Sequence, residues 1–286
     1  MDFEIISPAT CKELKQMLIN NQGKNIRIGA GFTDLIIDMR KNNPVDLTVI
    51  NLSQLKEKEF TTVQTGENEI RIGALTTTAA IIKNAYLTEH FPVLTEAASG
   101  LASGQIREVA TIGGNVCQAS PSGDLSCAIA SLKACFEIMD MNGNIRTEAL
   151  TDFFKGPGKT NLCKNEVLRS IVIPVNKGKI NKSGFIKIGK RASMECSVVS
   201  LAYHILAGPD DTIVSAGIAC GAVAPTVVFC DKAAALLTGK KINNIPYGVI
   251  EQFAALVQQA ASPIDDIRAS AWYRKEVLFN SAKSIF

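Results

Sequence analysis

The sequence has few of the residues that perform acid–base chemistry or hold metals. It contains only two histidines, and its eight cysteines include no C-x-x-C pair and no neighbouring histidine at a zinc or iron–sulfur spacing. We therefore expect no metal site in this chain. His90 precedes a predicted helix and His204 lies in a predicted strand. Neither has a nearby partner for catalysis, so both are interpreted as structural residues.

An excess of charge and a membrane-length apolar segment are also missing. The 30 basic and 27 acidic residues leave a net charge of +3 without basic blocks, so a nucleic-acid or lipid-binding footprint is not indicated. The longest uncharged stretch, residues 212–230, is rich in small residues and contains Pro225, which favours buried strands over a bilayer span. The acidic start, Met-Asp-Phe-Glu, lacks the features of a signal peptide and favours the cytoplasm.

The composition that is present, 47% hydrophobic over 286 residues, supports a substantial core and one to three domains. Residues 26–30 alternate like a strand that ends in a glycine turn, and a helix is predicted over 33–40. The same pentapeptide, Ile-Arg-Ile-Gly-Ala, returns at 70–74 and precedes another helical pattern. A polar segment at 176–184 indicates a domain boundary, which we place near residue 177.

Beyond this boundary, apolar patterns predict three strands followed by three helices. The strands cover 185–190, 197–206 and 213–222, and the helices cover 232–237, 248–261 and 268–285. This order predicts an α+β domain whose helices are segregated from its sheet.

Two glycine-containing segments have the form of phosphate-binding turns. A strand that ends in glycine lets backbone N–H groups approach a phosphate, and a following helix adds its positive end. Residues 28–35 have this form and residues 111–115 repeat it, but neither matches a P-loop or the G-x-G-x-x-G dinucleotide turn. Either segment alone is more simply explained as a tight strand–helix connection.

Together, the two segments predict a site that grips a diphosphate from two sides. The hydroxyls of Thr33, Thr111 and Ser120 and the amide of Asn115 are candidate hydrogen-bond partners. Asp124 would repel a pyrophosphate, so as a ligand it must accept hydrogen bonds from sugar or ribityl hydroxyls. Its other interpretation is a cap of the helix that follows.

Both segments resemble loops of the FAD-binding subunits of the molybdenum hydroxylases, the xanthine dehydrogenase family. Ala-Gly-Phe-Thr-Asp-Leu at 30–35 resembles the family's A-G-G-T-D-L loop. Ala-Thr-Ile-Gly-Gly-Asn at 110–115 with Ala-Ser-Pro-Ser-Gly-Asp at 119–124 resembles its A-T-I-G-G-N…A-S-P-x-x-D loop. Further similar segments are Gln105–Arg107, Phe154–Lys159, Glu166–Ile171 and Gly221–Thr226. The similarity therefore runs through nearly the whole chain.

The resemblance implies a fold and a division of the chain. The fold is α+β, with an FAD-binding domain over 1–177 whose two subdomains, about 1–57 and 58–177, have the vanillyl-alcohol oxidase type of fold. A C-terminal domain over 178–286 is implied to hold a three-stranded antiparallel sheet and helices.

The resemblance also implies which residues contact FAD. Those implied to wrap the pyrophosphate are Ile28, Gly29, Ala30, Gly31, Phe32, Thr33, Asp34 and Leu35. Those implied to meet the remaining diphosphate, ribose and ribityl groups are Thr111, Gly114, Asn115, Ser120 and Asp124. Leu168 and Lys187 are implied to lie by the flavin or adenine, although strand alternation alone predicts an outward-facing lysine.

Two positions depart from the family pattern. Phe32 replaces the second glycine of the first loop, and Gly104 stands where a proline is common before Gln-Ile-Arg. If Phe32 must adopt a positive φ, its side chain costs on the order of 1–2 kcal/mol. The carry-over of an FAD contact to Phe32 therefore depends on the backbone of this loop.

The activity that the resemblance implies is electron transfer through noncovalent FAD. Electrons would arrive from a partner's [2Fe-2S] centres and pass to NAD⁺ or another acceptor. The implied partners are an iron–sulfur subunit and a molybdenum-binding subunit that carries molybdopterin and oxidises the substrate. Similarity around 156–159 and 224–226 favours a purine (xanthine) dehydrogenase. No histidine lies in the FAD loops, so histidyl attachment of the flavin is not expected.

Two other functions remain open at this point. One is a self-contained FAD-dependent reductase or oxidase of the same fold, against which the shortage of general acids argues. The other is a non-catalytic scaffold subunit that has kept the fold and lost the cofactor.

Overall fold

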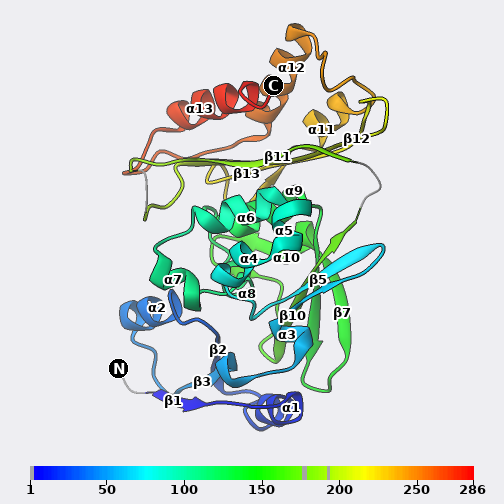
Figure 1. The fold of residues 1–286 in the computed structure, drawn as a ribbon. Coiled ribbons are helices and arrows are strands. Elements are labelled where there is room, and N and C mark those ends of the chain that lie inside the picture. The colour runs from blue at the N-terminus through cyan, green and yellow to red at the C-terminus, as the bar shows by residue number, and fades with distance from the viewer. Residues whose placement is uncertain (1–2, 176–178, 192–193) are drawn as a thin grey trace.

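A computed structural model describes residues 3–175, 179–191 and 194–286, so the boundary predicted near residue 177 lies outside the described residues. The described residues form three larger sheets, which follow one another from the N-terminal to the C-terminal end of the molecule (Figure 1), and a small two-stranded sheet. Helices lie between the second and third sheets and cover the far side of the third.

The first sheet has three parallel strands in the order β1-β3-β2. Its elements are β1 (Phe3–Ile6), α1 (Cys11–Asn20), β2 (Asn25–Gly29), α2 (Leu35–Asn42) and β3 (Leu47–Asn51). Helix α1 begins where Thr10 accepts a hydrogen bond from the backbone N–H of Glu13, at 3.2 Å, as an N-cap does. Leu14 and Leu18, four residues apart on one face, are fully buried against the sheet.

The second sheet is antiparallel, with five strands in the order β4-β5-β10-β6-β7. These strands are β4 (Val63–Thr65), β5 (Glu69–Gly73), β6 (Cys135–Asp140), β7 (Ile145–Ala149) and β10 (Glu166–Pro174). The helices between β5 and β6 are α4 (Thr78–Lys83), α5 (Ala85–His90), α6 (Pro92–Ser99), α7 (Gly104–Val109), α8 (Ile112–Gln118) and α9 (Asp124–Ser131). Ile72, Phe136, Ile138 and Ile171 are fully buried in the core that these helices share with the sheet.

The second sheet and its helices form what we call the second unit of the chain, and short elements complete it. They are the 3-10 turn η1 (Leu52–Gln54), α3 (Lys58–Thr61), α10 (Leu150–Phe153), β8 (Phe154–Gly156) and β9 (Lys159–Thr160). The β8–β9 hairpin approaches helix α8, because the N–H of Gly158 donates to the carbonyl of Ala119 at 3.0 Å.

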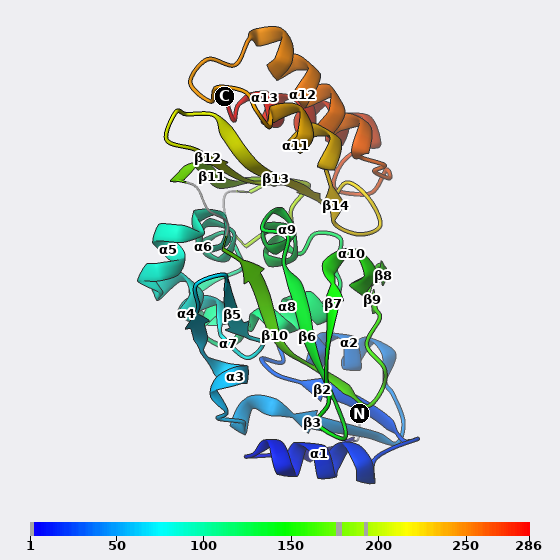
Figure 2. The same cartoon turned by 90° about the vertical axis from the view of Figure 1, so that its right-hand side faces the viewer.

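The third sheet confirms the predicted antiparallel strands and adds a short fourth, in the order β11-β12-β13-β14. Its elements are β11 (Lys179–Ile188), β12 (Val199–Ala207), β13 (Ile213–Gly221), β14 (Val228–Phe229), α11 (Asp231–Leu237), α12 (Tyr247–Ala260) and α13 (Ala271–Lys283). Helices α11 to α13 cover one face and α6 and α9 the other (Figure 2). Gly217 permits this close packing, since a Cβ there would lie 1.8 Å from the carbonyl oxygen of Ser131.

The third sheet and helices α11 to α13 form the third unit. His204 is buried where this unit packs against the second unit. Its Nδ1 lies 3.0 Å from the hydroxyl of Ser183, and its ring stacks on Phe91 with 6.0 Å between the centroids. Burial lowers the pKa of His204 to about 4 from 6.5. These contacts agree with the structural role expected for this histidine.

The stability of the folded chain should therefore fall in mild acid. Below pH 6.5 the unfolded chain takes up a proton on His204, whereas the folded chain resists protonation down to about pH 4. The stability contributed by the neutral ring is thus complete above pH 6.5 and is lost towards pH 4, a change of up to about 3 kcal/mol. The free energy of unfolding, measured with urea, should fall as the pH is lowered across this range. His204→Gln should make that dependence on pH weaker, whereas His90→Gln should leave it unchanged. An unchanged dependence on pH in His204→Gln would contradict the assignment.

Candidate functional site

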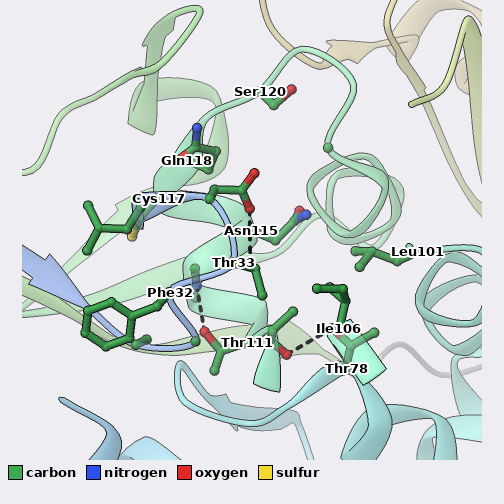
Figure 3. A pocket seen from close by; sticks show the side chains of 18 of the residues that line it. Phe32, Thr33, Thr78, Leu101, Ile106, Thr111, Asn115, Cys117, Gln118 and Ser120 are labelled. Carbon is green, nitrogen blue, oxygen red and sulfur yellow. Dashed lines mark hydrogen bonds between the residues drawn. The ribbon is translucent and has the colours of Figure 1, made fainter. Parts of the chain in front are cut away.

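A cavity of about 650 Å³ lies between the first sheet, helices α7 to α9 and strands β10 and β11 (Figure 3). Of the site residues predicted from the sequence, the cavity is lined by all except Gly29. A Cβ on Gly29 would lie 2.5 Å from the ring of Phe32, so this glycine makes room for that side chain instead. The structure therefore brings together segments that are far apart in the sequence.

The first loop follows the predicted pattern of strand, glycine turn and helix. Strand β2 ends at Gly29 and helix α2 begins at Leu35, two residues later than predicted. Gly31 is pressed against the second unit, because a Cβ there would lie 2.1 Å from the carbonyl oxygen of Val109. The loop thus crosses directly beside the segment that leads into the second loop.

Phe32 adopts a left-handed backbone conformation, with φ at 59°, which glycine adopts more readily than a residue with a side chain. Its ring packs with Met39, Leu47 and Val49 in a small core between the first sheet and helix α2. Burial of the ring offsets the cost of the left-handed conformation, which is about 1–2 kcal/mol for a residue with a Cβ. Phe32 is therefore accommodated in a conformation that favours glycine.

The second loop differs from its prediction, because its glycines lie in a helix rather than in a turn after a strand. Thr111 is the N-cap of helix α8, and its Oγ1 accepts a hydrogen bond from the N–H of Gly114 at 3.0 Å. Gly113 faces inward, where a Cβ would lie 2.6 Å from Ala74. Gly114 faces the cavity and is exposed. Gly113 therefore permits close packing against Ala74, whereas Gly114 keeps the cavity free of a side chain.

Asn115 joins this helix to the next. Its Oδ1 accepts hydrogen bonds from the N–H and the hydroxyl of Ser126, both at 3.2 Å. Among the described residues its Nδ2 has no bonded partner, and the side chain lines the cavity, so this amide is available as a donor there. Ser120, on the turn before helix α9, lines the same cavity and its hydroxyl lies 3.1 Å from that of Ser122.

Asp124 connects the second unit to the third sheet. Its Oδ2 accepts from the ammonium of Lys187 at 2.6 Å, and its Oδ1 accepts from the hydroxyl of Ser197 at 2.6 Å. Lys187 also donates to the carbonyl of Gly100, at 2.9 Å. Burial raises the pKa of the Asp124 carboxyl, and Lys187 and Ser197 oppose that rise. The cap interpretation of Asp124 is wrong, because it is the first residue of α9 and Gly123 is the N-cap.

Lys187 is not the outward-facing lysine that strand alternation alone predicts. Its side chain is 19% exposed and lines the cavity. Its charge is already paired with Asp124, so the two side chains together add no net charge to the site.

Several lining residues were missed from the sequence. They are Leu101, Ala102, Ser103 and Ile106 before and within α7, Cys117 and Gln118 at the end of α8, and Met194, Glu195 and Cys196 before β12. The Gln-Ile-Arg motif at 105–107 pointed to part of this group, because Ile106 belongs to the motif. Arg107 of that motif donates to the carbonyls of Ser99, Leu101 and Ala102 at 2.9–3.3 Å, which shapes the turn beside the cavity.

Comparison with known families identifies this arrangement. Residues 1–176 match the model of the FAD binding domain in molybdopterin dehydrogenase, and residues 185–286 match that of the CO dehydrogenase flavoprotein C-terminal domain. The chain belongs to the FAD-binding subunits of the molybdenum hydroxylases. FAD is therefore its cofactor, and its class is oxidoreductase.

Several relatives of this FAD-binding subunit match along most of their length. The nicotinate dehydrogenase FAD-subunit of Eubacterium barkeri is 29% identical, over 100% of this chain and 95% of its own. The xanthine dehydrogenase FAD-binding subunit of Escherichia coli O157:H7 is 27% identical, over 97% and 92%. Among solved structures, a chain of quinoline 2-oxidoreductase from Pseudomonas putida 86 has a TM-score of 0.87 at 23% identity, over 100% and 95%. The last likeness supports the predicted α+β FAD-binding fold.

The residues of this FAD-binding subunit fit the chemistry of the cofactor. Gly114 leaves the helix surface at the cavity free of a side chain, although its N–H is bonded to Thr111 Oγ1, and the side-chain amide of Asn115 offers an N–H donor there. Leu101, Ile106 and Leu168 supply apolar surface for a ring system. The ionisable groups in the described lining are Arg27, Asp34, Asp124, Glu166, Lys187 and Glu195. Carboxylates outnumber cations in this lining, so the side chains supply no net positive charge for a diphosphate.

None of the helices within 3–175, 179–191 and 194–286 is long and apolar enough to cross a bilayer.

Proposed function

We propose that this FAD-binding subunit is the electron-transfer component of a heteromeric molybdenum hydroxylase. An iron–sulfur subunit and a molybdenum-binding subunit would be its partners, and NAD⁺ its electron acceptor. The observation that carries the proposal is a cavity lined by both family loops in a chain that matches FAD subunits over nearly their whole length. The names of those relatives describe them as FAD subunits of dehydrogenases, which supports assembly with further subunits.

The roles proposed for the lining residues follow from their chemistry. The first loop, Ile28 to Leu35, would wrap the pyrophosphate, with Gly29 supporting it from behind Phe32. The remaining diphosphate, ribose and ribityl contacts would come from Thr111, Gly114, Asn115, Ser120 and Asp124. Leu168 and Lys187 would lie by the flavin or adenine.

Bound FAD supplies two-electron chemistry, including hydride exchange with a nicotinamide. The chain's own residues would bind, orient and shield it. Leu101, Ile106 and Leu168 exclude water from one part of the cavity, and the Asp124–Lys187 pair fixes polar groups in another. The binding is proposed to be noncovalent, because neither histidine of the chain lines the cavity.

We propose a purine such as xanthine as the substrate of the whole complex, on the similarity of residues 156–159 and 224–226 and on the xanthine dehydrogenase relative. Nicotinate is the second candidate, since the nicotinate dehydrogenase subunit is 29% identical over the full chain.

Purification of the complex from its native source tests the proposal. We expect two further polypeptides, one with [2Fe-2S] centres and one with molybdopterin, and reduction of NAD⁺ when xanthine is added. Acid precipitation should release the yellow colour into the supernatant. Turnover by this chain alone would support the self-contained flavoenzyme instead, a colourless complex would support the scaffold, and activity with nicotinate would move the substrate to the second candidate.

A further inference from the structure

One wall of the cavity runs from the end of β9, through the connection at 161–165, into the start of β10. It is lined by Thr160 of β9, Leu162 of the connection, and Glu166, Val167 and Leu168, the first three residues of β10. Glu166 also belongs to a group of ion pairs with Arg146 and Glu148, neither of which lines the described cavity. The shape of this wall therefore depends in part on side chains outside the cavity.

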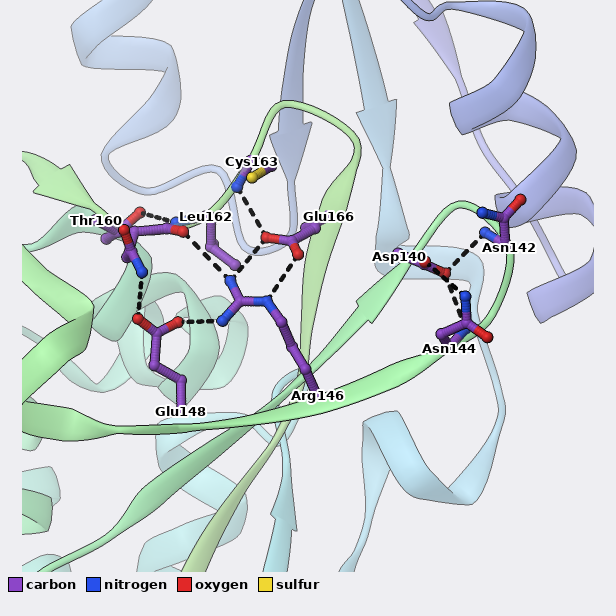
Figure 4. A network of polar contacts seen from close by, with 10 residues as sticks. Asp140, Asn142, Asn144, Arg146, Glu148, Thr160, Leu162, Cys163 and Glu166 are labelled. Atoms are coloured by element: carbon purple, nitrogen blue, oxygen red, sulfur yellow. Dashed lines mark hydrogen bonds and ion pairs between the residues drawn. The ribbon is translucent and has the colours of Figure 1, made fainter.

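Arg146 lies at the centre of these ion pairs (Figure 4). Its Nε and Nη2 donate to the two carboxylate oxygens of Glu166, both at 2.8 Å, and its Nη1 donates to Glu148 at 2.5 Å. Such a forked pairing fixes the carboxylate in direction as well as in distance. Hydrogen bonds from Arg146 lower the pKa of Glu166, so this carboxyl stays ionised in the folded chain at neutral pH.

The same group of residues holds the connection at two further points. Glu166 accepts from the N–H of Cys163 at 2.9 Å, and Arg146 donates to the carbonyl of Asn161 at 3.3 Å. Glu148, which is 7% exposed, accepts from the side-chain amide of Asn161 at 2.5 Å. One guanidinium thus ties both ends of the connection to strand β7.

The register of the sheet places these contacts on the face that carries the cavity. Arg146 pairs with Ile138 of β6, and Ile138 pairs with Leu168 of β10. Partners in register point to the same face, and Ile138 belongs to the core under the helices. Arg146 itself does not appear in the described cavity lining, so any effect on the cavity must pass through Glu166 and the connection.

We infer that Arg146 is a positioning residue for FAD, which holds the cavity wall at 160–168 in the shape that the cofactor requires. This inference rests on the proposal that the cavity is the FAD site. A purely structural role would lower the stability of the chain without lowering its affinity for FAD. In a purely electrostatic role, Arg146 would favour FAD only because its positive charge offsets one of the two carboxylates, Glu148 and Glu166, and so lowers the repulsion of the diphosphate.

The same sheet offers a matched control on its other face. Arg71 of β5 donates to Glu137 of β6 at 3.1 Å, and neither lines the described cavity. The arginine side chains are 42% exposed for Arg71 and 39% for Arg146, and their carboxylates are 12% exposed for Glu137 and 11% for Glu166. Loss of either arginine therefore removes an ion pair of similar burial from the same sheet.

FAD titration of the apo-protein, followed by quenching of flavin fluorescence, tests the inference together with urea unfolding. We expect Arg146→Met to weaken FAD binding at least 10-fold and Arg71→Met to leave it within 2-fold, with similar losses of stability. Glu166→Gln distinguishes the positioning role from the electrostatic one. If Arg146 acts by holding the cavity wall through Glu166, this variant should bind FAD more weakly. If Arg146 acts only by offsetting negative charge, removal of the Glu166 charge should make FAD bind more tightly. Arg146→Lys, which keeps the charge but loses the fork, should bind FAD with an affinity between those of Arg146→Met and the unaltered chain.

The inference, but not the proposed function, would be overturned by an FAD affinity of Arg146→Met within 2-fold of the unaltered chain, or by tighter FAD binding in Glu166→Gln. An equal loss of affinity in Arg71→Met would assign the effect to stability and would also overturn it. If the unaltered apo-protein does not bind FAD at all, the assignment of the cavity fails and the inference fails with it.

Discussion

Replacing Gly114 with valine is expected to leave the protein folded and without FAD. Gly114 is exposed at the cavity, and the nearest atom to a Cβ built there is Thr111 Oγ1, at 3.0 Å. A valine therefore places its methyl groups in the cavity, over the backbone that the cofactor is proposed to approach. The free energy of unfolding should change by less than about 1 kcal/mol, because valine replaces a glycine within a helix.

The measurement is the ratio of flavin to protein after purification with excess FAD. We expect a ratio near one for the unaltered chain and near zero for Gly114→Val. Gly104→Ala is the matched control, since Gly104 lies in the neighbouring helix α7 with nothing within 4 Å of a Cβ. A full complement of FAD in folded Gly114→Val would show that helix α8 does not contact the cofactor.

The neighbouring glycine separates cofactor binding from folding. A Cβ on Gly113 would lie 2.6 Å from both the Cβ and the carbonyl oxygen of Ala74, so the backbone must shift to admit it. Overpacking of this kind costs about 1–3 kcal/mol. Adjacent substitutions in one helix thus affect different properties, which the sequence alone does not distinguish.

The first loop could be predicted because its signals are local. Alternation, a glycine turn and a helical pattern occur within residues 26–40, and the structure has β2 and α2 there. The left-handed conformation of Phe32 depends instead on its packing with Met39, Leu47 and Val49. No periodicity in the sequence reveals that compensation.

The second loop could not be predicted in the same way. Two adjacent glycines disfavour a helix by about 1 kcal/mol each, so local propensity indicates a turn at 113–114. The cap at Thr111 and the contact of Gly113 with Ala74 override that propensity. Tertiary packing therefore decides the structure at the position where the sequence motif is most distinctive.

The group around Asp124 was beyond sequence reasoning for another reason. Lys187 and Ser197 are 63 and 73 residues further along the chain, in and after a strand of the third sheet. The resemblance named Asp124 and Lys187 separately as FAD contacts. Only the fold shows that they form an ion pair. A substitution of either residue therefore leaves the charge of the other unpaired, in addition to any effect on a ligand.

Removal of either member of this pair should destabilise the chain strongly. Asp124 and Lys187 have side chains 6% and 19% exposed and an oxygen–nitrogen distance of 2.6 Å. A buried charge left without its partner costs about 3 kcal/mol or more. We expect Asp124→Asn and Lys187→Met each to lower the free energy of unfolding of the apo-protein by that amount, measured by urea unfolding at pH 7.

The double variant decides whether the loss comes from the unpaired charge. Asp124→Asn with Lys187→Met buries no charge, so it should be more stable than the sum of the single effects predicts. The exposed pair of Lys241 and Asp210, at 2.7 Å, is the control, because Lys241→Met should change stability little despite a similar distance. Single variants as stable as the unaltered chain, or strictly additive effects, would show that the pair does not hold the second unit to the third sheet. A cavity lined by residues from both units would then need another explanation for how they are kept together.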